Sequence, residues 1–168
     1  MKEAYGEILS LTEWLKQSGE SNNFGEASTF PNLIRWSNAI TQANLGKNLN
    51  FDNQYDSSDI NRIAVVNIKK SSGKKESNGK DLTKYVSSDW DLLEKQIVSL
   101  KPDFIVCCGT FDLIKSRIQF TKDEHGCRYN KIKWLAHHKP YIINFVHPAS
   151  RGMRHSHMYY ALAAISAP

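Results

Sequence analysis

The sequence predicts an α/β protein built on a short, largely parallel sheet with helices on both faces. Three apolar runs of five to seven residues, the first of them rich in β-branched side chains, alternate with segments whose apolar residues recur every three or four positions. Runs of the first kind are typical of strands buried on both faces, and segments of the second kind indicate amphipathic helices. The length of 168 residues suits one domain with a hydrophobic core.

The first part of the chain predicts two helices separated by a loop. One helical face of apolar residues runs through Gly6–Gln17, and Gly19 ends this helix. Ser18–Ser28 is polar and contains glycine, which predicts a loop. Pro31 is favourable in a first helical turn and opens the second helix. The expected buried side of that helix carries Leu33, Trp36 and Ile40.

The middle of the chain predicts a loop, a strand and a basic segment. Residues 44–60 are rich in Asn, Asp and Ser, which favours a loop or short helical turns. Arg62–Ile68 is a nearly continuous apolar run, so we expect a strand covered on both faces. Asn67 lies inside this run, and a buried amide needs partners, so it either pins the structure or contacts a ligand. Lys69–Lys80 is predicted to be a basic, flexible segment.

A clearly marked helix precedes the second predicted strand. Ser88 and Asp91 have the spacing of a capping box, and Lys101–Pro102 ends the helix. The next run, Asp103–Cys108, predicts a second buried strand. The expected apolar face of the helix carries Trp90, Leu93, Ile97 and Leu100.

The remaining elements continue the alternation. Gly109–Thr110 is expected to turn the chain into a helix over Phe111–Ile118. Residues 121–133 are polar and predict an excursion from the sheet. Tyr141–Val146 predicts the third strand, and the last helix is expected over His155–Ile165.

Polar or turn-forming residues follow each predicted strand. Asn67 lies at the end of the first, Gly109–Thr110 follows the second, and His147–Pro148 follows the third. Ligands of open parallel sheets bind outside the carboxyl ends of the strands. An amide, a glycine turn and an imidazole are therefore expected to converge on one edge of the sheet.

Composition excludes several classes of protein. Hydrophobic residues make up 40% and charged residues 23%, which argues against a disordered or fibrous chain. No apolar stretch reaches the roughly 18 residues that a membrane-spanning helix needs, and the first residues lack the pattern of an export signal. Cys107, Cys108 and Cys127 form no spaced framework, so we expect reduced thiols in a cytoplasmic protein without a membrane partner.

The charge balance leaves two interpretations open. Lys and Arg number 22 against 17 Asp and Glu, a formal net charge of +5. Such a balance is compatible with a polyanionic partner, but it is equally typical of a mildly basic soluble surface. The histidines and cysteines do not form a recognised zinc spacing, so we expect neither a metal nor another cofactor.

Four segments together resemble the uracil-DNA glycosylase superfamily. LKPDFIVCCGT (100–110) resembles its helix–Lys/Pro–strand–Gly segment, and FVHPASRGM (145–153) resembles the strand that ends in its His-Pro-Ser motif. RIAVVNIKK (62–70) is similar to the strand whose Asn reads the base. KEAYG (2–6) looks like a degenerate form of the superfamily's Gly-Glu-Ala-Pro-Gly motif.

The resemblance implies a three-layer α/β/α fold with a short, mainly parallel central sheet, and an enzyme that cleaves the N-glycosidic bond of a flipped pyrimidine. A base inside a duplex must leave the stack to be reached. His147 matches the imidazole that stabilises the departing base as negative charge develops on it. Asn67 matches the amide that donates to and accepts from the pyrimidine edge. The implied partner is uracil-containing or otherwise modified DNA, or a nucleotide.

The resemblance assigns further site residues by position. Glu3 matches the group that orients water, and it is the second candidate catalytic residue. The remaining base-binding candidates are Phe30, Phe24 and Tyr5, with an aromatic side chain stacking on the base. The candidates for backbone contacts are Ser150, Arg151, Arg154, Lys69 and Lys70, with Met153 as the apolar wedge.

The sequence departs from the family pattern at three points. Ala149 replaces the usual Ser, although Ser150 follows at once, and Tyr5 replaces the motif proline. The family places a strand ahead of the front motif, which here begins at Lys2. The expected single domain, residues 1–168, therefore either lacks its first strand or fills that place with something else.

Two alternatives to a DNA glycosylase remain open on the same fold. The first is a catalytically inactive module that binds nucleic acid or a nucleotide, which the degenerate front motif favours. The second is a glycosidase directed at a free or modified nucleotide in a defence role. A basic groove leading to the pocket would separate the DNA glycosylase from this last enzyme.

Overall fold

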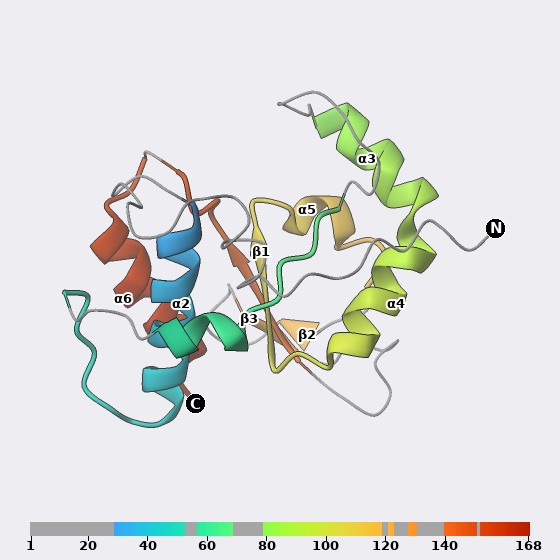
Figure 1. Ribbon diagram of the computed structural model, residues 1–168. Coiled ribbons are helices and arrows are strands. Elements are labelled where there is room, and N and C mark those ends of the chain that lie inside the picture. Colours follow the sequence, from blue (N-terminus) through green and yellow to red (C-terminus); the bar gives the residue numbers. More distant parts are fainter. Residues whose placement is uncertain are drawn as a thin grey trace. The chain divides into compact units, whose positions relative to one another are not determined.

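The computed structural model (Figure 1) describes residues 29–52, 57–68, 79–118, 121–122, 128–130, 140–150 and 152–168. The chain divides into two compact units. Unit 1 comprises Met1–Val65 and Pro148–Pro168, and unit 2 is the continuous stretch Val66–His147. The predicted helix at 6–17 and the loop at 18–28 lie outside the described residues.

Unit 1 is built on two parallel helices, α2 (Thr29–Asn44) and α6 (His155–Ser166), with the 3-10 helix η1 (Ser57–Arg62) beside α2. Three hydrogen-bonded pairs join the long helices in the same order along both: Asn32 with His155, Asn38 with Tyr159, and Asn44 with Ser166. The helices therefore run in one direction, with both N-termini at the same end.

Part of the apolar core of unit 1 lies between these helices, where Ala39 of α2 packs with Tyr159 and Ala163 of α6. Ile34, Trp36 and Ala39 are buried on α2. The predicted helix after Pro31 is confirmed. Of the three residues expected on its buried side, Trp36 is buried, whereas Leu33 and Ile40 are only half-buried. The buried apolar residues of α6 are Met158, Tyr159, Leu162 and Ala163, spaced three and four positions apart around one face.

Unit 2 contains a mixed sheet in the order β1-β4-β3-β2. β1 (Phe104–Cys108) and β4 (Tyr141–Phe145) are parallel neighbours, paired from Phe104–Tyr141 to Cys108–Phe145. β3 (Arg128–Asn130) is antiparallel to β4, and β2 (Thr121–Lys122) is antiparallel to β3. The α/β class is confirmed, but the largely parallel sheet is not, because residues predicted to leave the sheet return to it as antiparallel strands.

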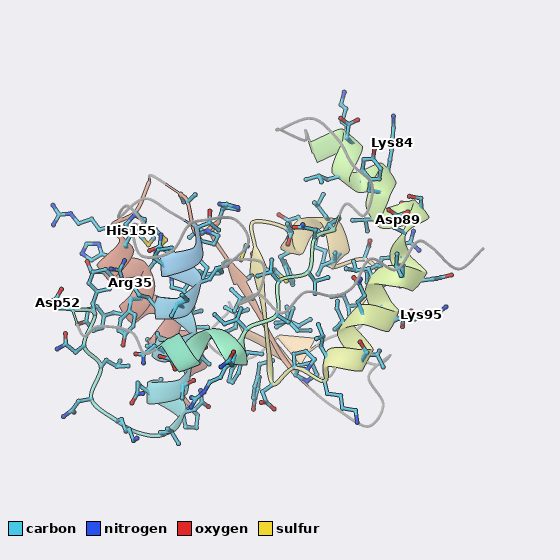
Figure 2. The ribbon with its side chains drawn as sticks, in the orientation of Figure 1. Arg35, Asp52, Lys84, Asp89, Lys95 and His155 are labelled. Carbon is cyan, nitrogen blue, oxygen red and sulfur yellow. The ribbon has the colours of Figure 1, made fainter. Side chains whose placement is uncertain are left out.

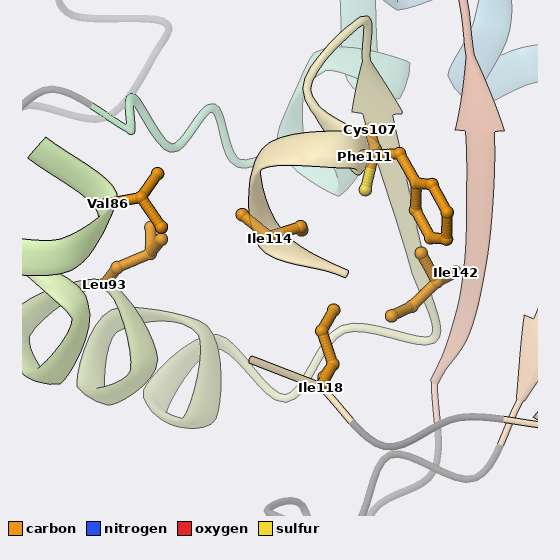
Figure 3. Packing of buried hydrophobic residues seen from close by; sticks show 7 residues of the cluster. All are labelled: Val86, Leu93, Cys107, Phe111, Ile114, Ile118 and Ile142. Carbon is orange, nitrogen blue, oxygen red and sulfur yellow. The ribbon is translucent and has the colours of Figure 1, made fainter. Parts of the chain in front are cut away.

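Three helices accompany the sheet in unit 2: α3 (Gly79–Ser88), α4 (Trp90–Leu100) and α5 (Phe111–Ile114). They supply most of one apolar cluster (Figure 3). Leu93 of the predicted α4 face is buried, whereas Leu100 is 47% exposed. None of the helices described in either unit is long and apolar enough to cross a membrane. The buried cluster consists of Val86, Leu93, Cys107, Phe111, Ile114, Ile118 and Ile142.

The two ends of α4 test the predicted start and stop signals of this helix. The expected capping box is wrong, because the N-cap is Asp89 and its side chain makes no capping hydrogen bond. The Ser88 hydroxyl instead donates to the Tyr85 carbonyl oxygen of α3. The predicted C-terminal end is confirmed, and there Lys101 takes the left-handed conformation, with φ +46°.

Residues 62–68, predicted to form a buried strand, are not a strand. Arg62 ends η1, and residues 63–67 carry no regular structure. Val66 and Ile68 pack against the apolar cluster of unit 2, while Val65 is 49% exposed. The prediction failed because an apolar run does not reveal whether both of its sides will be covered, and here only one side is.

Candidate functional site at the carboxyl edge of the sheet

The carboxyl ends of β1 and β4 meet at one edge of the sheet, as predicted. Cys108 and Phe145 are paired residues at the two strand ends, and the Gly109 N–H donates to the Phe145 carbonyl oxygen at 2.7 Å. The turn at Gly109–Thr110 therefore leaves the sheet beside the segment that leads to His147. This is the position at which open α/β sheets bind ligands.

Gly109 is required by the backbone of this turn. Its φ is +71°, in the left-handed region that favours glycine. A Cβ atom at this position would meet nothing within 4 Å, so the constraint comes from conformation and not from crowding. The turn carries the chain from β1 into α5, whose first residue, Phe111, is buried.

His147 stands two residues beyond β4 and is exposed. Pro148, the next residue, is buried and begins the second part of unit 1. The imidazole is thus accessible to solvent at the carboxyl edge while the following residue is anchored. An exposed imidazole at such an edge can donate a hydrogen bond to a ligand atom.

Asn67 belongs to unit 2, as His147 does, but it is not buried as the sequence predicted. The amide is exposed, whereas its neighbours Val66 and Ile68 pack on the apolar cluster that includes Cys107 and Phe111. The expected buried amide is therefore wrong. The reason is that the cluster takes up the side chains on either side of Asn67, and the amide between them is left facing solvent.

The loop after His147 carries the expected DNA contacts in unit 1. Ser150 is half-buried, and Met153 is 41% exposed. Arg154 is exposed and is the N-cap residue of α6, with extended backbone angles. These side chains are accessible near a helix N-terminus, where the helix dipole favours negative charge.

Several predicted site residues lie outside the described part of the chain. For Phe30 the structure describes the backbone, within α2, but not the side chain. The residues without a described position are Glu3, Tyr5, Phe24, Lys69, Lys70 and Arg151.

Sequence reasoning missed Asn32, whose side chain is 1% exposed. Its Nδ2 donates to the Pro148 carbonyl oxygen at 2.8 Å and lies 2.9 Å from Nδ1 of His155. One amide on α2 thus contacts both ends of the loop that follows His147. A polar residue directly after the helix-opening Pro31 was the available signal.

The two described cysteines are unsuited to nucleophilic or metal chemistry. Burial raises the pKa of Cys107 to about 12 and that of Cys108 to about 11, so both thiols stay protonated at neutral pH. Both are free thiols, as expected. The described residues contain no group of three His, Cys, Asp or Glu side chains placed to hold a metal ion.

Comparisons with protein-family models, with curated proteins and with solved structures found no match for this chain. The candidate site therefore stands on its geometry: a glycine turn at the carboxyl edge of a parallel strand pair, with an exposed imidazole two residues beyond β4. The exposed amide of Asn67 belongs to the same unit.

Proposed function

We propose that this protein is a DNA base glycosylase of the uracil-DNA glycosylase type, with the three-layer arrangement of that superfamily. The observation that supports this function best is the exposed His147 directly beyond β4, beside the Gly109 turn. The activity is hydrolysis of the bond between a pyrimidine and deoxyribose, with water adding to the sugar carbon and the base leaving with the bonding electrons.

His147 acts on the leaving base in this proposal. Negative charge develops on the pyrimidine as the glycosidic bond breaks, and a hydrogen bond from the imidazole to the base oxygen stabilises that charge. The exposed position lets a flipped nucleotide reach the ring. Because the stabilisation is strongest in the transition state, loss of the imidazole lowers the rate more than the affinity.

Asn67 recognises the base in this proposal. A side-chain amide offers one acceptor and two donor hydrogens, which match the alternating groups on a pyrimidine edge. Its exposure leaves these groups available to a ligand. By their place in the chain after His147, the proposal assigns Ser150 and Arg154 to phosphate oxygens and Met153 to an apolar wedge between bases; all three side chains are at least partly exposed.

The test is release of free uracil from single-stranded DNA that contains deoxyuridine. We expect His147→Ala to lower the rate by about 100- to 1,000-fold, the range for removing one donor to a developing anion. His157→Ala is the matched control, since His157 is an exposed histidine on α6 of unit 1. No release by the unmodified chain, or equal rates for the two variants, would refute the proposal.

A second candidate is a binding module without catalytic activity. It is favoured by the irregular backbone at residues 63–67, which holds Asn67 without the hydrogen-bond ladder of a strand. Catalysis needs tight alignment of the reacting groups, whereas binding tolerates looser geometry. The module predicts salt-dependent binding of uracil-containing DNA with no base released, and about 10-fold weaker binding for Asn67→Ala. Asn48→Ala, at an exposed amide of unit 1, is the control.

A further inference from the structure

The buried amide of Asn32 has one hydrogen-bonding arrangement that satisfies its neighbours. Its Nδ2 lies 2.8 Å from the Pro148 carbonyl oxygen and 2.9 Å from Nδ1 of His155. A carbonyl oxygen can only accept, so the amide nitrogen must face Pro148; the reversed amide would set two oxygens against each other. The second hydrogen of Nδ2 then points to the ring of His155.

This arrangement determines the protonation of His155. Its Nδ1 must accept the hydrogen bond from Asn32, so this contact requires the neutral ring with its proton on Nε2. A protonated ring carries hydrogen on both nitrogens, which would place Nδ1–H against the amide N–H. The contact between α2 and α6 at this point is therefore made only by the neutral form of His155.

The charged and ionisable groups near the ring come from α2, from α6 and from the cap of α6. Neither α2 nor α6 has an acidic residue in its first turn. Arg35 is the only ionisable side chain of α2, the described helix that packs on α6. The basic or ionisable neighbours on α6 and its cap are Arg154, His157, Tyr159 and Tyr160 (Figure 2 shows His155 and Arg35).

We propose that Asn32 is the positioning residue for Pro148 and His155, the two ends of the loop after His147, and that it holds His155 only while that ring is neutral. We call these two hydrogen bonds the Asn32 clamp. One side chain ties the first residue of this loop to the last and both of them to α2. Acid breaks the His155 half of the clamp and leaves the Pro148 half. Any effect of this change on DNA binding rests on the proposed function, which assigns Ser150 and Arg154 in this loop to contacts with the DNA backbone.

The test measures hydrogen-exchange protection of the Met158 amide, which donates to the Arg154 carbonyl oxygen in the first turn of α6, at about pH 7.5 and about pH 5, corrected for intrinsic exchange rates. We expect protection to fall about 3- to 10-fold in acid, which corresponds to loss of one hydrogen bond. His155→Asn keeps an acceptor near the Nδ1 position and does not titrate, so its protection should be equal at both pH values.

His157→Asn is the control and should retain the acid sensitivity of the unmodified chain. Nitrogen-detected NMR of His155 should show the Nε2–H form near pH 7.5. An Nδ1–H form, or acid sensitivity that persists in His155→Asn, overturns the clamp. Because both readouts are structural, a chain that releases no base but shows this pattern contradicts the proposed function and leaves the clamp standing.

Discussion

The two units of this chain bury different kinds of side chain. In unit 1, Asn32, Asp59 and Ser166 are buried polar residues that hydrogen-bond across elements or within α6. In unit 2, the buried residues of the described part are apolar, with Cys107 as the only one that ionises. Polar pairs have direction and a required partner, so they determine the register of α2 against α6, while apolar contacts stabilise in proportion to the surface they bury.

The largest expected effect comes from emptying the core of unit 2. Ile142 is fully buried on β4 within the apolar cluster. We expect Ile142→Ala to lower the free energy of unfolding by about 2–5 kcal/mol, and Ile142→Val by about 1 kcal/mol. Urea unfolding followed by circular dichroism measures both. Equal losses for the two variants would show that the site collapses around the deletion and that buried volume does not set the stability of unit 2.

High pH should weaken unit 2 through its buried thiol. Burial raises the pKa of Cys107 from 9.0 to about 12, so above pH 9 the unfolded chain loses a proton that the folded chain keeps. Stability is complete below pH 9 and falls as the pH rises towards 12. At about pH 10.5, some 1.5 units above the unfolded value, the loss is about 2 kcal/mol.

Cys107→Ala isolates this effect from other groups that titrate in the same range. Burial also raises the pKa of Tyr159 in unit 1, so the unmodified chain has more than one source of alkaline sensitivity. The measured quantity is the difference between the two chains in unfolding free energy at about pH 8 and pH 10.5. Parallel curves would exclude the thiol as a source of the loss.

Removing one amide from unit 1 should cost less than emptying the core of unit 2. Asn38 donates to a carboxylate oxygen of Asp59 at 3.2 Å and accepts from the Tyr159 hydroxyl at 3.0 Å. Asn38→Ala takes this partner from both groups, and we expect a loss of about 1.5 kcal/mol. Asn44→Ala is the comparison, because its amide is exposed and its loss should be smaller. A double-mutant cycle with Tyr159→Phe measures the coupling.

The smallest expected effect is a gain at the end of α4. Lys101 holds φ +46° without being glycine, which costs conformational energy that Lys101→Gly removes. Glycine also loses more entropy on folding, so we expect a net gain of about 0.5 kcal/mol. Thermal unfolding measures it, and Lys95→Gly in the interior of the same helix should instead destabilise. A loss at Lys101 would mean that its side chain makes a contact worth more than the strain.

The parts of the fold that the sequence predicted are those whose signal is local. The runs at 104–108 and 141–145 were predicted as strands from their short apolar character, and their parallel pairing brings Gly109 and the segment that leads to His147 to one edge. The helix α3 was missed, since its apolar positions are few within a polar segment. Residues 62–68 failed as a strand because pairing and coverage depend on distant elements.

The residues of the candidate site also differ in whether a local sequence signal predicts their position. The placement of His147 follows from a strand end that the sequence marks. The contact between Asn32 and His155 joins positions 123 apart, and nothing in either local segment specifies that pair. The exposure of Asn67 depends on which neighbours pack inward, a choice made by the cluster of unit 2. The sequence therefore could not predict two features of the site: the hydrogen-bonded pair of Asn32 and His155, and the exposure of Asn67.

Unit 1 consists of two stretches of chain that are separated in the sequence by unit 2, and this order affects folding during translation. Translation completes all of Val66–His147 before α6 emerges, so the inserted unit can build its core first. At ~5–20 residues per second, the 123 positions between Asn32 and His155 correspond to about 6–25 seconds. Throughout that interval the newly made α2 has no α6 to cover Ala39, which packs with Tyr159 and Ala163 in the folded chain, so its apolar surface stays open to contacts with other proteins.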